Sequence, residues 1–182
     1  MIRFSKYHGC GNNFVMVRER ELLASRYPDK DGAALCEKEY PRLAQEVCDI
    51  NTGIGADGLI IVREDPALEM VFYNMDGSRA PMCGNGIRCF AYFCLAEGIR
   101  SEKSYAVKTL AGDMIVEVTC EDPFMARINM GKPIYDPESI AVKSDREDFL
   151  KQELTISDGS KWMVNSLFMG TVHTVVFVED YD

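Results

Sequence analysis

One segment of the sequence, residues 85–97, constrains the fold more than any other because it has the spacing of a buried α-helix. Its apolar residues fall at positions i, i+3, i+4, i+7 and i+8: Ile87, Phe90, Ala91, Cys94 and Leu95. Gly98 follows as a C-terminal stop, and Tyr92 and Phe93 add apolar side chains between the others. A helix that is apolar on more than one face needs cover on several sides. We therefore predict that strands surround it.

Short β-type runs dominate the rest of the chain. A turn rich in Gly and Asn at residues 9–13 predicts a hairpin near the start, and residues 40–48 carry a second helical spacing. Residues 18–39 and 131–153 are expected to be irregular. The β-type runs are residues 2–4, 14–17, 59–62, 70–73, 105–110, 114–120, 126–130, 162–168 and 174–178. Together these patterns predict an α+β fold.

The β-type pattern breaks at Asp122 and Pro123, which predicts two domains, residues 1–122 and 123–182. Residues 124–182 contain apolar strands but no helix that could cover them. We therefore expect the second domain to be incomplete.

The composition excludes several classes of partner. The 20 Lys and Arg against 29 Asp and Glu give a net charge of −9, which repels a nucleic acid backbone. The first residues carry no secretory pattern, and the longest apolar run, residues 90–96, is far shorter than the ~20 residues that span a membrane. An odd number of cysteines, 7, indicates reduced thiols and a cytoplasmic location. With 2 His and no C-x-x-C pair, no metal site is expected.

Gly53, Gly55 and Gly58 fit the G-x-G-x-x-G pattern of dinucleotide-binding folds. That pattern must follow a strand and begin a helix, whereas here a predicted helix comes first and a strand follows. We interpret these glycines as backbone turns rather than as a nucleotide site.

Cys83 is the best candidate for chemistry, because it lies in the N-cap region of the predicted helix. The free N–H groups of the first turn and the positive end of the helix dipole favour a thiolate there. The N–H groups of Gly84, Asn85 and Gly86 can also hold a carboxylate. A base beside a carboxylate site suits removal of the α-proton of an amino acid. The structural alternative is that Cys83 only caps a Gly/Asn turn.

A longer pattern surrounds Cys83. Asn74-x-Asp76-Gly77-Ser78 is followed after four residues by Cys83-Gly84-Asn85-Gly86-x-Arg88. This pattern resembles the signature of the diaminopimelate epimerase family. Further matches lie in order along nearly the whole chain: residues 4–6, 8–14, 53–58, 130–133 and 170–173.

The resemblance implies a mixed β-sheet barrel wrapped around a central helix in each of two pseudo-symmetric domains, with the substrate in the cleft between them. It implies cofactor-independent epimerisation of LL-diaminopimelate to meso-diaminopimelate, a precursor of lysine and peptidoglycan. Two cysteines act as thiolate base and thiol acid in that family. The residues it assigns are Cys83 as one catalytic cysteine, Asn12, Asn74, Gly84 and Asn85 as substrate contacts, and His173 as a residue that influences the protonation of the pair.

The departures from the family pattern are equally specific. Family members are about half again as long, and their second catalytic cysteine has no counterpart here, since Cys120 lies in a strand pattern and Cys10 in a turn. Thr171 and Val172 replace the common Asn-Pro before His173. We therefore expect weak or no activity from the 182 residues alone.

Two other interpretations stay open. The chain could represent a related cofactor-independent racemase of another amino acid, as the change at Thr171 suggests, or a non-catalytic remnant. No lysine context indicates pyridoxal phosphate, and no cofactor is expected. The expected partner is a small amino acid rather than nucleic acid or membrane, and a homodimer is the assembly considered. The thiols of Cys48, Cys89 and Cys94 are interpreted as packing residues, and Cys10 as exposed and oxidisable.

Overall fold

The computed structural model describes residues 2–28, 30–35 and 38–180. It divides into two compact units, Met1–Asn129 (unit 1) and Met130–Asp182 (unit 2). The helices described in unit 1 are α1 (Glu19–Arg26), α2 (Gly32–Leu35), α3 (Glu39–Cys48) and α4 (Gly84–Ala96). Its strands are β1 (Ser5–Gly9), β2 (Asn12–Arg18), β3 (Gly58–Arg63), β4 (Glu69–Asn74), β5 (Ser104–Thr109), β6 (Gly112–Glu121) and β7 (Phe124–Ile128).

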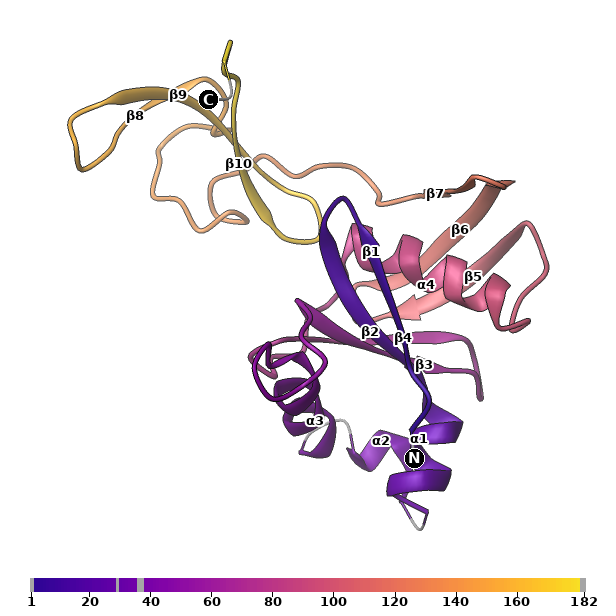
Figure 1. Ribbon diagram of the computed structural model, residues 1–182. Helices are drawn as coiled ribbons and strands as arrows, with labels where there is room; N and C mark the ends of the chain where they lie inside the picture. The colour runs from indigo at the N-terminus through magenta and orange to yellow at the C-terminus, as the bar shows by residue number, and fades with distance from the viewer. Residues whose placement is uncertain (1, 29, 36–37, 181–182) are drawn as a thin grey trace. The chain divides into compact units, whose positions relative to one another are not determined.

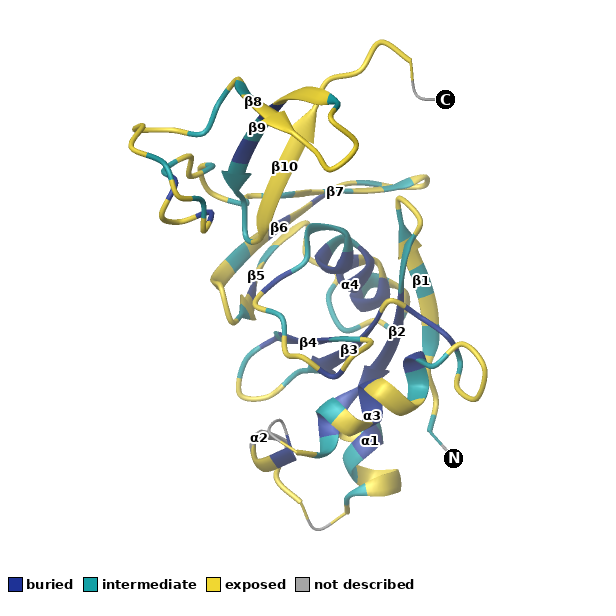
Figure 2. Ribbon diagram, turned by 90° about the vertical axis from the view of Figure 1, so that its left-hand side faces the viewer, coloured by how far each residue is buried: buried dark blue, intermediate teal, exposed yellow. Residues whose placement is uncertain are grey.

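The strands of unit 1 form one mixed sheet in sequence order, β1 to β7. The pairs β2–β3 and β4–β5 are parallel, and the other neighbours are antiparallel. The sheet curls around α4, which contacts β1, β2, β3 and β7 (Figures 1 and 2). This confirms the predicted α+β class and the central position of the helix. The architecture is a half-barrel of strands around one buried helix.

The middle strands β2, β3 and β4 are apolar on both faces because both faces are covered. Val15, Leu59 and Ile61 pack in a core with residues of α1 and α3. Ile60, which points to the opposite face, lies against the start of α4: a Cβ added at Gly86 would be 3.2 Å from its Cδ1. The absence of a side chain at Gly86 therefore lets the helix approach the sheet closely.

A buried polar network fixes α1 on the sheet. The Glu19 carboxylate accepts hydrogen bonds from the Tyr40 hydroxyl at 2.9 Å and from two nitrogens of Arg63, both at 2.7 Å. Arg18 donates to Glu64 from Nε and Nη2, at 2.8 and 2.6 Å. These charges are acceptable in the interior because each has a charged, hydrogen-bonded partner.

Unit 2 is a smaller antiparallel sheet of β8 (Gln152–Thr155), β9 (Lys161–Phe168) and β10 (Val172–Val176), in the order β10-β9-β8. Among its described residues, the buried hydrophobic side chains are Ile140 and Val164. Every residue of β10 is exposed. None of the described helices of the chain has the length and apolar character needed to cross a membrane.

The division by contacts lies after Asn129. Asp122 and Pro123 form the tight turn between β6 and β7, whose residues pair across one hairpin, as Val116 with Ile128. The two domains predicted from the sequence, residues 1–122 and 123–182, stay a prediction.

Candidate functional site

The site is built at the N-terminus of α4. As predicted, Cys83 is the N-cap residue, with extended backbone angles (φ −141°, ψ 121°), and its carbonyl accepts the first helical hydrogen bond from Ile87 at 2.8 Å. The Cys83 side chain is half-buried. Its Sγ accepts from the backbone N–H of Gly86 at 3.4 Å. An N–H donor and the positive end of the helix dipole thus both lie at the sulfur.

A second donor reaches the same sulfur from the β1–β2 hairpin. Asn12 Nδ2 lies 3.8 Å from Cys83 Sγ. Asn12 pairs with Gly9, and a two-residue turn, Cys10 and Gly11, joins them with φ of 55° and 83°. A Cβ added at Gly9 would be 3.4 Å from the Asn85 Cβ, so the missing side chain lets the hairpin tip lie directly on α4. The hairpin thereby positions Asn12 on Cys83.

Asn85 has a fixed orientation in the first turn of α4. Its side-chain oxygen accepts a hydrogen bond from Arg88 Nη2 at 2.5 Å, which directs its NH2 group away from Arg88. The N–H groups of Gly84 and Asn85 have no partner within the helix because they belong to its first turn. Together these groups can donate to a carboxylate placed at the end of α4.

Asn74 lies at the same end of the sheet as Asn12. It is the last residue of β4 and pairs with Gly58, which in turn pairs with Phe14 of β2. Asn74 Nδ2 donates to Ser78 Oγ at 2.9 Å, within a turn that the Asp76 carboxylate also stabilises by accepting from the Ser78 N–H. Hydrogen bonds from the Ser78 side chain and from the Ser78 backbone N–H lower the pKa of Asp76. Asn12, at the start of β2, and Asn74, at the end of β4, therefore lie at the same end of one sheet.

The glycine-rich loop has the structural role predicted for it. Gly53 and Ile54 cap the C-terminus of α3 through hydrogen bonds to Asp49 O and Val47 O, and a Cβ at Gly53 would collide with Glu46 O. Gly58 starts β3. The loop ends at Asp57, whose carboxylate accepts from the N–H and Nδ2 of Asn13, at 2.7 and 2.6 Å. It therefore braces the strand that carries Asn12.

His173 belongs to unit 2, where it lies on β10 opposite Leu167 and is exposed. The backbone carbonyl of Thr171, two residues before His173, accepts a hydrogen bond from the N–H of Met169 at 2.9 Å. The structure thus brings together Asn12, Cys83, Gly84 and Asn85. Asn74 lies at the same end of the sheet, and His173 belongs to the other unit.

The other described thiols fit the packing interpretation where they are buried. Burial raises the pKa of Cys48 and Cys89 to about 11 and that of Cys94 to about 12, which makes them poor bases at neutral pH. Cys10 is exposed and Cys120 half-buried. Within the part of the chain that the structure describes, no three His, Cys, Asp or Glu side chains gather as a metal-binding group.

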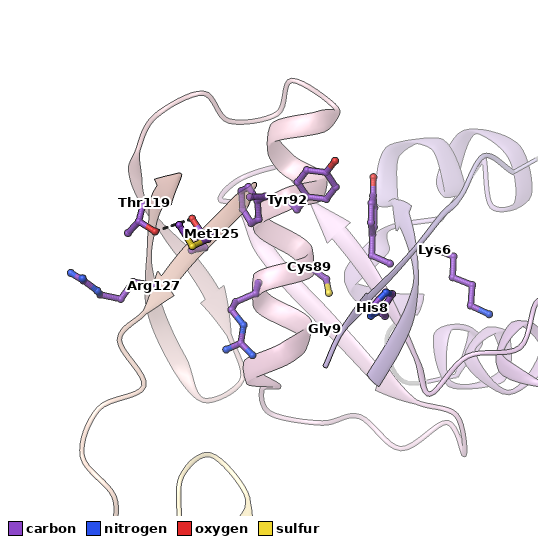
Figure 3. Close-up of a pocket in the computed structure, with 12 residues that line it drawn as sticks. Lys6, His8, Gly9, Cys89, Tyr92, Thr119, Met125 and Arg127 are labelled. Carbon is purple, nitrogen blue, oxygen red and sulfur yellow. Dashed lines mark hydrogen bonds between the residues drawn. The ribbon is translucent and has the colours of Figure 1, made fainter. Parts of the chain in front are cut away.

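A cavity of about 750 Å3 that the sequence did not indicate lies between β1, α4 and β7 (Figure 3). Cys89 and Tyr92 line it from the helix. The signal that could have revealed it is topological. β1 and β7 are the two edges of the curled sheet, and none of the described strands joins them. The remaining lining residues are Lys6, Tyr7, His8, Gly9, Arg88, Thr119, Phe124, Met125, Ala126 and Arg127.

Comparison with known proteins identifies the family. Residues 4–135 match the family model described as diaminopimelate epimerase. The diaminopimelate epimerases of Alkaliphilus metalliredigens and Caldanaerobacter subterraneus are 40% and 35% identical to this chain over its whole length. The chain belongs to the diaminopimelate epimerase family. It spans 61% and 62% of the length of these two relatives.

Solved structures extend the likeness to the fold. A probable proline racemase from Agrobacterium radiobacter matches 97% of this chain and 52% of its own, with a TM-score of 0.64 at 14% identity. A hydroxyproline epimerase from Agrobacterium vitis matches 96% of this chain and 51% of its own, with a TM-score of 0.63 at 11% identity. This member of the diaminopimelate epimerase family therefore shares its fold with these proteins. The shared feature is the curled sheet around a central helix.

Proposed function

We propose that this chain supplies the amino-terminal catalytic half of a cofactor-independent diaminopimelate epimerase. The observation that supports this most strongly is the environment of Cys83, an N-cap thiol whose sulfur accepts hydrogen bonds from Gly86 N and Asn12 Nδ2. A thiolate so placed is a base that needs no metal or organic cofactor. The reaction proposed is the interconversion of LL- and meso-diaminopimelate.

The mechanism follows from what each group can donate or accept. The Cys83 thiolate removes the α-proton, and the developing negative charge spreads into the substrate carboxylate. The N–H groups of Gly84 and Asn85 and the Asn85 amide stabilise that charge, and they cost no reorganisation because Arg88 already holds the Asn85 oxygen. Asn12 and Asn74 are proposed to orient the substrate. Return of a proton to the opposite face needs a second acid, which the family resemblance places outside these 182 residues.

His173 is proposed to act on the protonation of the cysteine pair, and this rests on the family resemblance alone. Replacement of His173 by Gln in a version extended to family length should shift the pH profile of the reaction and leave the chemistry intact. An unchanged profile would remove His173 from the site.

The deciding experiment measures incorporation of deuterium from D2O into the α-position of LL-diaminopimelate under reducing conditions. Three forms are compared: this chain, its Cys83→Ala variant and the version extended to family length. Exchange by the extended form should fall at least about 100-fold when Cys83 is replaced, because a positioned base contributes about 10²–10⁴-fold. The matched control is Cys120→Ala, which removes a half-buried thiol of β6 outside the site. Absence of exchange in every form would contradict the assignment.

A racemase of another amino acid is the second candidate, because Thr171 and Val172 stand where the family commonly has Asn-Pro. The same assay with proline and other amino acids distinguishes the two. Exchange into another amino acid but not into diaminopimelate would favour this candidate, and exchange into neither would favour a non-catalytic remnant.

The cellular role follows from the proposed reaction. It would supply meso-diaminopimelate for lysine and peptidoglycan synthesis in the cytoplasm, and the 6 described cysteines are all free thiols, as that compartment requires. The net charge of −9 supports a small-molecule substrate over a nucleic acid partner. A homodimer is the assembly that sedimentation would test.

A further inference from the structure

Asp57 is an exposed residue with no part in the mechanism proposed above. It directly precedes β3, the strand that lies between β2 and β4 (Figure 1). Its backbone continues the sheet by one step on both sides. The N–H of Asp57 donates to Asn13 O at 3.0 Å, and its carbonyl accepts from the Met75 N–H at 3.1 Å. Asp57 therefore joins the residues that directly follow Asn12 and Asn74.

The Asp57 carboxylate adds a second connection to the β1–β2 hairpin. Its Oδ2 accepts from the backbone N–H of Asn13 at 2.7 Å and from Asn13 Nδ2 at 2.6 Å. A hydrogen bond to an ionised acceptor is shorter and roughly twice as strong as one between neutral groups. Because the two donors belong to the main chain and the side chain of Asn13, the carboxylate restrains both.

The restraint on Asn13 extends to Asn12, which directly precedes it and meets the Cys83 thiol. Asn12 Nδ2 lies 3.8 Å from Cys83 Sγ, a long contact that a small displacement of the hairpin would break. The hairpin tip is open on its outer side, because β1 is an edge strand of the described sheet and a Cβ at Gly11 would meet no atom within 4 Å. The Asp57 carboxylate therefore holds the hairpin from the side of the sheet.

Asn74, the other asparagine at this end of the sheet, is held in a different way. The Met75 N–H donates to the backbone carbonyl of Asp57, and Asn74 Nδ2 donates to Ser78 Oγ at 2.9 Å. Neither of these hydrogen bonds uses the Asp57 side chain. A substitution of Asp57 should therefore release Asn12 and leave Asn74 in place, so that Asn74 serves as an internal control.

We propose that Asp57 is a positioning residue of this site, whose carboxylate acts through Asn13 to hold Asn12 against Cys83. The consequence for catalysis rests on the proposed function, in which Asn12 orients the substrate beside the Cys83 base. A misplacement of about 1 Å can lower an enzymatic rate by about 100-fold, so a group remote from the α-proton can still affect its removal. Because Asp57 is exposed, its hydrogen bonds should contribute little to global stability.

Nuclear magnetic resonance of the 182-residue chain, reduced and labelled with 15N at asparagine, tests the proposal directly. The nuclear Overhauser effect between the Asn12 side-chain amide protons and the Cys83 β-protons reports the contact under test. The effect between the Asn74 amide protons and the Ser78 β-protons reports the internal control. Asp57→Ala should abolish the first effect and keep the second. Retention of both effects, or loss of both, would overturn the proposal.

Two further variants examine the hydrogen bonds themselves. Asp57→Asn keeps an acceptor for the Asn13 N–H, and its NH2 group can donate to the Asn13 side-chain oxygen after that amide turns over. It should therefore retain the contact of Asn12 with Cys83. Asn13→Ala removes the side-chain bond to Asp57 and keeps the backbone bond, so it should weaken the contact without abolishing it. Loss of the contact in Asp57→Asn would show that charge rather than hydrogen bonding is required, and would contradict positioning through Asn13.

Asp49→Ala is the matched control, because Asp49 is an aspartate of the same connection between α3 and β3. Its carboxylate accepts from the backbone N–H groups of Asn51 and Thr52, at 2.8 and 2.7 Å, and from Thr52 Oγ1 at 2.9 Å. These bonds stay within the loop. Asp49→Ala should therefore keep the Asn12 contact, and its loss there would show that any loosening of the loop has the same effect as removal of the Asp57 carboxylate.

The kinetic test uses the version extended to family length. Asp57→Ala should lower kcat by about 10- to 100-fold, because the base and the substrate are no longer aligned. KM should change much less, because Asn74 and the first-turn N–H groups of α4 keep their places. Asp57→Asn should recover most of kcat, and Asp49→Ala should resemble the parent. Equal loss of kcat in the two Asp57 variants, or a change confined to KM, would contradict the positioning role.

The resonance measurement needs no enzyme activity, so its result separates from that of the exchange assay. Loss of the Asn12 contact in Asp57→Ala, without isotope exchange in any form of the chain, would support the positioning of Asn12 and contradict the proposed function. Isotope exchange with the contact intact in Asp57→Ala would support the proposed function and contradict the role of Asp57.

Discussion

Units 1 and 2 are both built on antiparallel or mixed sheets of apolar strands, yet they differ sharply in burial. Among the described residues, unit 1 contains every buried hydrophobic side chain except Ile140 and Val164. Figure 2 shows α4 and the middle strands of unit 1 as buried and β10 of unit 2 as exposed. The difference is that unit 1 contains helices that cover both faces of its middle strands. The apolar pattern of a strand determines its pairing with other strands. The burial of its side chains depends on whether a helix or another sheet covers them.

That contrast has energetic consequences. Full burial of a large apolar side chain contributes about 1.5–3 kcal/mol, and the contribution shrinks as the side chain stays in water. In β10, Val172, Val175 and Val176 remain exposed, so they contribute pairing but little hydrophobic free energy. We therefore expect unit 1 to unfold at higher denaturant concentration than unit 2.

The largest effect should come from Phe90→Ala in α4, where the side chain is fully buried. Loss of its contacts and the resulting cavity should lower the free energy of unfolding of unit 1 by about 3–5 kcal/mol. Two signals separate the units in a urea titration. Far-UV circular dichroism follows the described helices, all of which lie in unit 1, and fluorescence follows the single tryptophan, Trp162 of unit 2.

The matched control is Leu154→Ala, opposite Trp162 and 44% exposed, which should cost less than about 1 kcal/mol. Phe90→Ala should move the circular dichroism midpoint and leave the fluorescence midpoint in place. Equal shifts of both signals would show that the units unfold together and would break the comparison.

The sequence predicted well those elements whose signal is local. The period of residues 85–97 anticipated α4, and the Gly/Asn turn anticipated the β1–β2 hairpin, although β1 begins at Ser5 rather than at residue 2. The N-cap position of Cys83 also followed from sequence, because capping depends on residues adjacent in the chain.

Features that depend on distant partners were missed. Residues 19–26 form α1, not the irregular segment expected. The low apolar content of that helix is offset by Leu22 in the core and by the hydrogen bonds that Glu19 accepts from Arg63 of β3 and Tyr40 of α3. The contact of Asn12 with Cys83 joins residues 71 positions apart, and no local pattern encodes it. β8 was likewise missed, since its pairing with β9 rather than its composition makes it a strand.

Glu19→Ala should have the second largest effect on the free energy of unfolding. It extends the comparison of the two units from apolar side chains to ion pairs. The substitution removes the Glu19 carboxylate, to which Tyr40 and Arg63 donate in a mostly buried setting, while Arg63 keeps its hydrogen bond to Glu69. We expect the free energy of unfolding of unit 1, measured by circular dichroism, to fall by about 3 kcal/mol. The control, Glu153→Ala, removes an exposed ion pair with Lys161 in unit 2 and should change stability by less than about 1 kcal/mol. Comparable losses in the two variants would refute the role of burial.

Glu64 should make the stability of unit 1 depend on acid. The hydrogen bond from Arg18 lowers the pKa of Glu64, so the folded state holds its proton less tightly than the unfolded state does. Its stabilising contribution is therefore complete above the unfolded pKa of about 4.3 and is lost as the pH falls through the folded pKa. Glu64→Gln should be less stable than the parent at pH 7 and should converge with it on acidification, as urea titrations across pH would measure. A constant difference would exclude this linkage.

The smallest effect on stability should come from Phe177→Ser, just beyond β10, where the phenylalanine is 84% exposed. Little hydrophobic contact is lost, so the free energy of unfolding measured by tryptophan fluorescence should fall by less than about 0.5 kcal/mol. Self-association should respond more strongly, because an exposed apolar side chain beside an unpaired strand edge favours contacts between copies. Sedimentation over a range of concentrations should show weaker association in the variant. A stability loss above about 1 kcal/mol would mean instead that Phe177 is covered in solution, and that the two units differ less in burial than their side chains indicate.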